Sequence, residues 1–264
     1  MAREEGVGTL AFCDHMDIRA VSEGLGLARE IGIELFSGVE LSTSWRNREY
    51  HLLCYGFDPG SRSVRDLIEE SCERIWGLVP EVIEAFRSMG FLLDRRDIAG
   101  WGRSVPTGVS FLDALLKRNP GDPRLLCYTT GDRSGSPYLN FYQDFSRAGL
   151  ARAVTSGFPD LELTIRCLGG SGVLVLAHPG ETDEAGLGEL ERCGLDGLEV
   201  YSTHHSPPVT RYLAGVAESL GLLKSAGSDF HGERIKPGIA LGGVPGEPDQ
   251  ELLDAVRERM SAWQ

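Results

Sequence analysis

The sequence predicts an α/β fold, with a mainly parallel sheet or barrel and a largely helical insertion. Short apolar runs alternate with amphipathic helical segments before about residue 60 and again after about residue 160, and repeated βα units of this kind form parallel sheets. Between these stretches the apolar spacing is helical, with Gly-, Pro- and Arg-rich connections. We therefore expect a first barrel part at 1–58, a helical insertion or cap at 59–149, and a second barrel part at 150–264.

The first barrel part contains three expected strands and one expected helix. The strands are Thr9–Cys13, Ile33–Val39 and Leu52–Phe57. The helix, Ile18–Ile31, has apolar residues along one face and is stopped by Gly32. A polar loop is expected between the second and third strands, and the turn sequence Asp58-Pro59-Gly60 closes this part.

Helices dominate the expected insertion and alternate with strands after it. In the insertion, helices are expected at Val64–Met89, Phe111–Leu116 and Pro137–Ser146. In the second barrel part, they are expected at Leu161–Leu168, Glu184–Cys193, Pro208–Leu220 and Asp249–Trp263. The intervening strands are Val173–Ala177, Leu198–Tyr201 and Leu223–Ala226. In such folds the functional site lies at the carboxyl ends of the strands.

The composition is that of a globular chain with an acidic excess. The 264 residues carry a formal net charge of −13, which argues against a general surface for long nucleic acid, because phosphate neutralisation needs clustered Lys and Arg. The six cysteines show no Cys-x-x-Cys spacing, so we expect reduced thiols. No apolar stretch approaches the roughly 20 residues of a membrane helix and no signal-peptide pattern is visible, so we expect a cytoplasmic protein.

The histidines are few and lie next to expected strands. Of the six, His15, His178 and His231 follow apolar runs, and His51 opens another. His51 and Glu40 flank one loop, where Glu40 could bridge two cations and a neutral His51 could bind one of them. A glutamate at a strand end is more often solvated, and a lone histidine is more often only hydrogen-bonded. The repeated placement beside strands favours a metal site.

Four motifs resemble those of the PHP (polymerase and histidinol phosphatase) superfamily. They are Cys13-Asp14-His15, Gly38-Val39-Glu40 with His51, Ala177-His178-Pro179 and Ser228-Asp229-Phe230-His231. Their order and separation fit, as does a helical insertion between the third and fourth motif-bearing strands. The resemblance covers most of residues 6–60 and 165–245. It points to the stand-alone PHP phosphoesterases, which include enzymes acting on nucleoside 3′,5′-bisphosphates and short RNA.

The resemblance implies a distorted (β/α)7 barrel with two or three divalent metal ions at its C-terminal mouth. Glu40 would bridge two of the metals. His51 and His178 would bind one of these two ions, and Asp229 would bind the other. Manganese, iron and zinc all suit mixed imidazole and carboxylate ligands.

A third metal is implied between His15 and His231, with Asp14 as a ligand or an orienting partner. The superfamily pattern also begins with a strand ending in His-x-His and a further ligand, a segment that the sequence does not contain. We expect the true start to lie upstream, because a barrel without a central strand exposes two strand edges and an apolar face. The chain as given is then expected to hydrolyse phosphate esters far more slowly than a version with that strand.

The implied function is hydrolysis of a small phosphorylated metabolite or nucleotide, such as a nucleoside 3′,5′-bisphosphate, or of a short oligonucleotide. A hydroxide bridged by two metals would attack phosphorus, with Glu40, Asp229 and His231 as catalytic residues. The sequence contains no G-x-S-x-G elbow and no P-loop. Two alternatives remain: a poorly active or non-catalytic metal-binding remnant, and a histidinol phosphate phosphatase.

Several polar residues are weaker candidates. Arg152 and Arg147, just before the second barrel part resumes, are the candidates for binding a substrate phosphate, although a single Arg is more often solvated. His204 and His205 could line the mouth of the barrel, but adjacent histidines in a loop more often have no chemical role. Glu199 lies within an expected strand, and we expect it to be structural.

Overall fold

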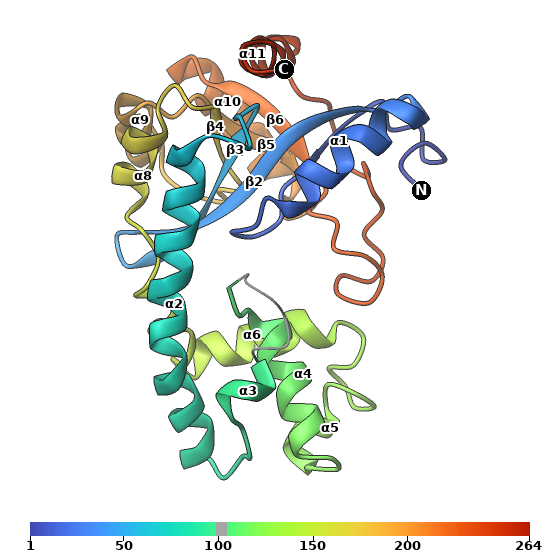
Figure 1. The fold of residues 1–264 in the computed structure, drawn as a ribbon, viewed down its shortest axis with the longest axis vertical. Coiled ribbons are helices and arrows are strands. Elements are labelled where there is room, and N and C mark those ends of the chain that lie inside the picture. The colour runs from blue at the N-terminus through green and yellow to red at the C-terminus, as the bar shows by residue number, and fades with distance from the viewer. Residues whose placement is uncertain (99–104) are drawn as a thin grey trace. The chain divides into compact units, whose positions relative to one another are not determined.

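The structure is a computed structural model that describes residues 1–98 and 105–264 (Figure 1). The chain forms two compact units. Unit 1 consists of Met1–Glu69, Pro159–Phe230 and Ala240–Gln264, and unit 2 consists of Glu70–Phe158 and His231–Ile239. Every strand found in the described residues belongs to unit 1.

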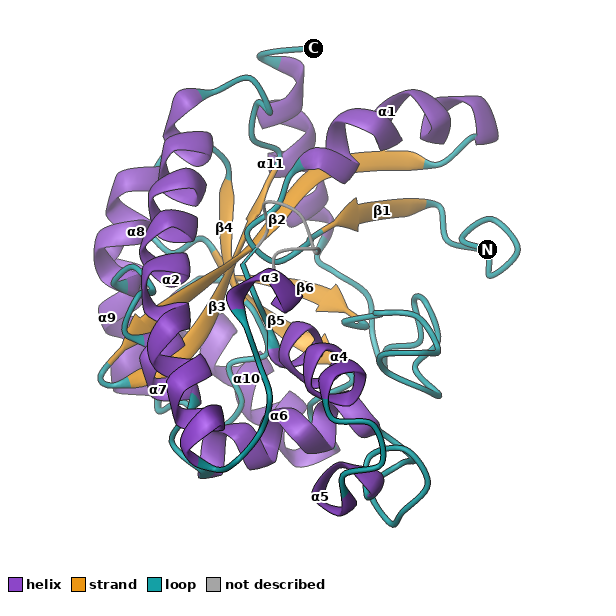
Figure 2. Cartoon of the chain, turned by 60° about the horizontal axis from the view of Figure 1, so that its bottom comes forward, coloured by secondary structure: helices purple, strands orange, loops and turns teal. Residues whose placement is uncertain are grey.

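Unit 1 is a mixed α/β body built on a six-stranded sheet that curls into a half-barrel (Figure 2). The strands are β1 (Thr9–Phe12), β2 (Glu34–Trp45), β3 (Arg48–Tyr55), β4 (Val173–Leu176), β5 (Gly197–Ser202) and β6 (Leu223–Gly227). They lie side by side in chain order. The pairs β1–β2, β4–β5 and β5–β6 are parallel, whereas β3 is antiparallel to both of its neighbours.

The connection between β2 and β3 differs from the expected polar loop. Instead of ending at Val39, β2 continues to Trp45 and turns directly into β3. The two turn residues, Arg46 and Asn47, both have positive φ (50° and 62°), which matches the twist that a two-residue hairpin requires. The loop expectation was wrong because the polar residues that suggested it are strand residues. Thr43, for example, donates its hydroxyl to the Tyr50 carbonyl at 2.7 Å.

Helices flank this sheet. Those lying entirely in unit 1 are α1 (Arg19–Ile31), α8 (Leu161–Leu168), α9 (Glu184–Cys193), α10 (Pro207–Leu220) and α11 (Gln250–Ser261). Asp160 and Asp183 cap α8 and α9 by accepting hydrogen bonds from backbone amides of the first turn, which fixes where these helices begin. The bounds expected for α8 and α9 are confirmed.

One face of the sheet is apolar at the end covered by α11. The buried cluster there, which we call the α11 core, consists of Phe36, Leu53, Tyr55, Val173, Val175, Ala177, Leu252, Val256 and Met260. Leu53 lies opposite Val175, and Tyr55 lies opposite Val173, so these side chains point to the same face. Glu40 lies opposite Leu53 on the other neighbouring strand, so this face carries a carboxylate beyond the α11 core.

The regular elements in the described part of unit 2 are helices, joined by turns and loops. Its helices are α2 (Arg62–Ser88, which begins in unit 1), α3 (Arg95–Ile98), α4 (Gly108–Arg118), α5 (Pro123–Leu126), α6 (Pro137–Arg147) and α7 (Ala151–Thr155). Phe86, Phe111 and Phe145 stack with ring centroids 5.5 to 6.0 Å apart and form the centre of its core. No helix in the described residues, α2 included, is long and apolar enough to cross a membrane.

Candidate metal centre

Three histidines surround the carboxylate of Glu40. His51 Nδ1 lies 2.7 Å from Glu40 Oε1, and His178 Nε2 lies 3.3 Å from the same oxygen. His15 Nε2 lies 3.7 Å from the second oxygen, Oε2. Potential ligand atoms of His15, Glu40 and His51 all fall within 4.8 Å of one another, which is the spacing of a metal-binding group.

Strand pairing brings these residues together. Glu40 lies within β2, and His15, three residues after β1, forms an isolated parallel bridge with it. His51 lies near the start of β3, and because β3 runs antiparallel, its start is level with the end of β4, which His178 follows. The Ala177 amide donates to the His51 carbonyl at 2.9 Å and continues that pairing beyond the strand. His51, near the start of the antiparallel strand β3, therefore lies beside His178, which follows the end of β4.

Burial and charge act together on this group. Glu40 is only 5% exposed. Burial alone would raise the pKa of Glu40, but the nearby His15 and His51 imidazoles hold it well below its usual range. Burial alone would lower the pKa of His51, but the Glu40 charge and hydrogen bonds to carboxylates raise that pKa to about 10. Glu40 is thus kept anionic, and a cation that binds His51 must displace a proton.

Glu49 adds an orienting contact that sequence reasoning missed. Its Oε1 lies 3.0 Å from His51 Nε2, the ring nitrogen that points away from Glu40. A carboxylate on the far nitrogen fixes the ring and its tautomer, as is usual for metal-binding histidines. Glu49 and His51 are two residues apart on one strand and therefore share a face, a signal that the sequence contains once β3 is known to begin at Arg48.

Strained backbone accompanies the predicted ligands. Among the described residues, five non-glycine residues have positive φ, and two of them form the β2–β3 turn. The other three are Met16 (51°), which follows His15, and the predicted ligands His178 (28°) and Asp229 (49°). Such conformations cost about 1–3 kcal/mol each and concentrate at functional sites.

A buried carboxylate on β5 holds the His178 backbone. Glu199 is 4% exposed, and its Oε2 accepts a hydrogen bond from the His178 amide at 3.0 Å. Burial raises the pKa of Glu199 to about 7, against the lowering effect of His178. Gly227 on the neighbouring strand leaves room for this carboxylate, since a Cβ there would lie 1.9 Å from Glu199 Oε1. Glu199 therefore supports the loop that carries His178, a role that its position in a strand did not reveal.

The remaining predicted residues lie in different surroundings. Asp14 is exposed, and its carbonyl accepts from the Glu40 amide at 3.2 Å. Asp229 follows β6 in unit 1 and pairs with His204, whereas His231 begins the segment that belongs to unit 2. Arg147 and Arg152 also belong to unit 2, and both are exposed. Arg147 lies 3.5 Å from Asp144.

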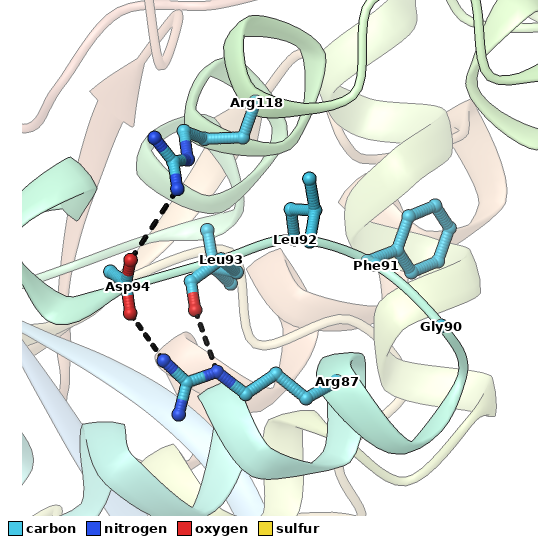
Figure 3. Close-up of a pocket in the computed structure, with 7 residues that line it drawn as sticks. All are labelled: Arg87, Gly90, Phe91, Leu92, Leu93, Asp94 and Arg118. Atoms are coloured by element: carbon cyan, nitrogen blue, oxygen red, sulfur yellow. Dashed lines mark hydrogen bonds and ion pairs between the residues drawn. The ribbon is translucent and has the colours of Figure 1, made fainter.

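Unit 2 contains a pocket of a different kind (Figure 3). It has a volume of about 410 Å³, and its lining includes Arg87, Asp94 and Arg118. Both arginines form ion pairs with Asp94, and Arg87 also donates to the Leu93 carbonyl at 2.9 Å. Arg118 also lies 3.3 Å from Asp97, so both arginines are already engaged with carboxylates. No histidine is among the described residues that line this pocket, unlike the group around Glu40.

The donor set around Glu40 suits a divalent cation. Imidazole nitrogens and a carboxylate are the ligands that manganese, iron and zinc share. Glu40 is buried, anionic and in contact with three imidazoles, an arrangement that concentrates lone pairs in one small space. His51 and His178 each present one nitrogen to it. The group is therefore a candidate metal site.

Comparison with known proteins finds relatives that act on phosphate esters. No protein-family model matches the chain. It is 25% identical to a 5′-3′ exoribonuclease of Haemophilus influenzae over 87% of this chain and 81% of that protein. It is 25% identical to a phosphoribosyl 1,2-cyclic phosphate 1,2-diphosphodiesterase of Eggerthella lenta (88% and 86%). It is 28% identical to a 3′,5′-nucleoside bisphosphate phosphatase of Chromobacterium violaceum (84% and 76%). All three relatives break phosphate ester bonds.

A solved structure shares the fold. The crystal structure of a protein assigned as a metal-dependent phosphoesterase from Bifidobacterium adolescentis aligns with a TM-score of 0.75. The alignment covers 98% of this chain and 88% of that one, at 22% sequence identity. The likeness at this identity concerns the fold, and it extends over both units.

Proposed function

We propose that this chain, which belongs to the PHP superfamily of metal-dependent phosphoesterases, hydrolyses a small phosphorylated metabolite or nucleotide at the centre around Glu40. The observation that carries the proposal is the convergence of His15, His51 and His178 on one buried carboxylate. The relatives supply the reaction class, because each of them cleaves a phosphate ester. A nucleoside 3′,5′-bisphosphate or a short oligonucleotide fits the relatives, and the net charge of −13 argues against long nucleic acid.

The centre is proposed to hold two or three ions of manganese, iron or zinc. Glu40, His51 and His178 hold the first, and Asp229 with Glu40 holds the second. When bound, such ions lower the pKa of a water molecule into the neutral range and draw charge from the phosphate oxygens. Glu40 remains anionic in its buried position, and Glu49 orients the His51 ring. Glu199 keeps the His178 loop in place.

A third ion and two arginines complete the proposed assignment. Asp14, His15 and His231 are the proposed ligands of the third ion, with His231 also taking part in catalysis. Arg152 and Arg147 are the proposed contacts of a substrate phosphate. If either arginine has this role, replacing it with Gln raises KM for a nucleoside bisphosphate and leaves metal content unchanged.

The finer fold assignment is a distorted (β/α)7 barrel with a helical insertion. Two features support it: the six strands lie in chain order in a curled sheet, and β1 and β6 each pair with one strand only among the described residues. A seventh strand placed between β1 and β6 would pair with both.

Phosphate release tests the function directly. The full chain is assayed with a nucleoside 3′,5′-bisphosphate and excess Mn²⁺, before and after removal of metal by a chelator. The control is Glu40→Gln, purified in the same way, because a contaminating phosphatase would persist in that preparation. Activity that depends on added metal and disappears with Glu40→Gln supports the proposal, and equal activity in both preparations refutes it.

Metal content tests the ligand assignment separately. His178→Ala is expected to lose most of the tightly bound metal, because His178 is one of the two imidazoles assigned to the first ion with Glu40. His15→Ala is expected to lose less, since His15 is assigned to the third ion. The measurement is metal per chain after gel filtration. Equal losses from the two variants would show that the ligands have been divided wrongly between the ions.

A further inference from the structure

A fourth imidazole extends the row that surrounds Glu40. The ring centroids of His15 and His51 are 4.9 Å apart, those of His51 and His178 are 5.1 Å apart, and those of His178 and His204 are 4.9 Å apart. The first three rings face Glu40. His204 instead faces Asp229, with Nε2 2.6 Å from Asp229 Oδ2. The row thus has a second carboxylate at its other end.

Two imidazoles of this row are paired with carboxylates in a similar way. His51 Nδ1 lies 2.7 Å from Glu40 Oε1, and His204 Nε2 lies 2.6 Å from Asp229 Oδ2. His178 lies between the two imidazole–carboxylate pairs. In both pairs an imidazole nitrogen and a carboxylate oxygen face each other, and these are donors that a divalent cation can take in place of a shared proton.

Sheet register places His204 beside Asp229. At the start of β5 and β6, Gly197 pairs with Leu223, an offset of 26 residues, whereas at the end Ser202 pairs with Gly227, an offset of 25. The register shift lies between Glu199 and Tyr201. With the second offset, 204 is level with 229. Without the shift it would be level with 230, a phenylalanine. A bulge that re-aims a side chain is a common device beside active sites.

The pairing continues beyond the strands and fixes both loops. Thr203 Oγ1 donates to the Ser228 carbonyl at 3.0 Å, one residue before His204 and Asp229 meet. Asp229 has a positive φ of 49°, so its backbone is held in a conformation that a non-glycine residue rarely adopts. The contact between His204 and Asp229 is therefore set by the register of β5 and β6 and by the contact between their two loops.

We propose that His204 is a protein ligand of the second metal ion, together with Asp229. The inference rests on the proposed function and adds a ligand to the ion for which only Asp229 and Glu40 were available. The His204 side chain is 41% exposed and that of Asp229 is 12%, against 18% for His51 and 7% for Glu40. The second ion is therefore the more solvent-accessible one, and it binds more weakly and exchanges faster.

The neighbouring histidine provides a matched control. His205 Nδ1 lies 3.0 Å from the Val200 carbonyl, and its Nε2 accepts from the Gly180 amide at 3.3 Å. Both of its nitrogens therefore serve the backbone, and it is not expected to bind metal. His204→Ala and His205→Ala change the same loop by the same number of atoms, but only the first removes a proposed ligand.

The experiment counts ions on the full chain. Wild type, His204→Ala and His205→Ala are stripped of metal, titrated with Co²⁺ and Mn²⁺ by calorimetry, and analysed for metal per chain. His204→Ala is expected to lose one ion relative to wild type, namely the weaker one, or to bind it at least 10-fold more weakly, while the tight ion is retained. His205→Ala is expected to keep the wild-type number. Circular dichroism of the metal-free variants establishes that each is folded, and the visible absorption of bound Co²⁺ reports a change in ligands independently of the count.

The outcomes separate this inference from the proposed function. If His204→Ala binds as many ions as wild type with the same affinities, the inference is wrong and the centre around Glu40 stands. If His205→Ala loses the same ion, the loss reflects the loop and the inference is also wrong. If wild type itself binds no divalent ion, the proposed function fails and the inference with it.

Discussion

On the face of the unit 1 sheet that carries Glu40, the same strands supply polar residues at one end and apolar residues at the other. On β3, His51 lies near the beginning and Tyr55 at the end, and β4 supplies Val173 and Val175 to the α11 core before the chain reaches His178. One end gathers charge and strained backbone, while the other is buried and apolar. We infer that packing of the α11 core offsets the free-energy cost of the strained backbone beside the ligands. Strained backbone persists only where the surrounding structure holds it in place.

The largest expected effect is at the charged end. Glu40→Gln removes the anion that three imidazoles face while keeping the shape of the side chain. We expect activity and metal affinity to fall by more than the roughly 10–100-fold that loss of an outer-shell partner costs. The metal-free protein is also expected to lose stability at pH 7, because the lowered Glu40 pKa and the raised His51 pKa mean that the two groups stabilise the fold there. Metal titrations are therefore made where urea denaturation curves show that the variant is folded. A loss of folding instead of metal binding would contradict the division between the two ends.

The apolar end should show the opposite behaviour. Leu252→Ala on α11 removes a side chain that is 4% exposed, and a cavity of this kind costs about 2–5 kcal/mol of unfolding free energy. Urea denaturation of the metal-free protein measures this cost. At temperatures where the variant is folded, its metal affinity is expected to remain close to that of wild type. A large change in affinity would mean that the α11 core also sets the ligand geometry.

Glu199 lies between the two ends, and its effect should depend on pH. Its pKa is raised to about 7 from an ordinary 4.5, so the folded state binds more protons than the unfolded state between these values. The stabilising contribution is therefore full below about pH 4.5 and is lost as the pH rises through about 7. Glu199→Gln, which can still accept from the His178 amide, should gain about 1–3 kcal/mol relative to wild type on going from pH 4.5 to 8. Glu40, His178 and Asp229 also affect Glu199, so the test compares denaturation of the two metal-free proteins across this range. A constant difference between them would contradict the assignment.

The smallest effect is expected at the surface beside α11. Arg257 forms two hydrogen bonds with Glu34, both 2.8 Å long, and holds the Glu34 pKa below its usual value. This contribution is present above the ordinary pKa of Glu34 and disappears as the pH falls through the lowered one. Both side chains are about 40% exposed, so solvent screening keeps this contribution small. Arg257→Gln should be slightly less stable than wild type at pH 7, and the difference should shrink as the pH falls below the ordinary pKa of Glu34, as measured by thermal denaturation.

Most helices and strands could be predicted from the sequence, because caps and apolar spacing are local signals. The helix expected at 161–168 is present with the same bounds, since Asp160 caps it and a buried stripe lines it. The β2–β3 hairpin could not be predicted in this way. Its polar strand residues resemble a loop, and its turn, Arg46-Asn47, lacks the Asn-Gly signature.

The part of the candidate site that lies at or near strand ends could be predicted from the sequence. The contacts that depend on the register between neighbouring strands could not. Glu40, His51 and His178 lie together because three neighbouring strands carry them. The contact between His204 and Asp229 depends on a one-residue register shift in β5, which has no sequence signal of its own. The support that Glu199 gives to His178 depends on a hydrogen bond from the His178 amide to the Glu199 carboxylate on β5. Both are properties of the assembled sheet.

The close approach of Gly227 to Glu199 couples two positions that are 28 residues apart in the chain. Gly227 does not have a positive φ, so its backbone would accept other residues, yet any Cβ would fall 1.9 Å from Glu199 Oε1. Substitution at 227 is therefore conditional on a shorter side chain at 199. A library that randomises position 227 alone is expected to return glycine, whereas one that randomises 199 and 227 together could find a different pair. A change at position 227 is therefore expected to occur together with a change at position 199.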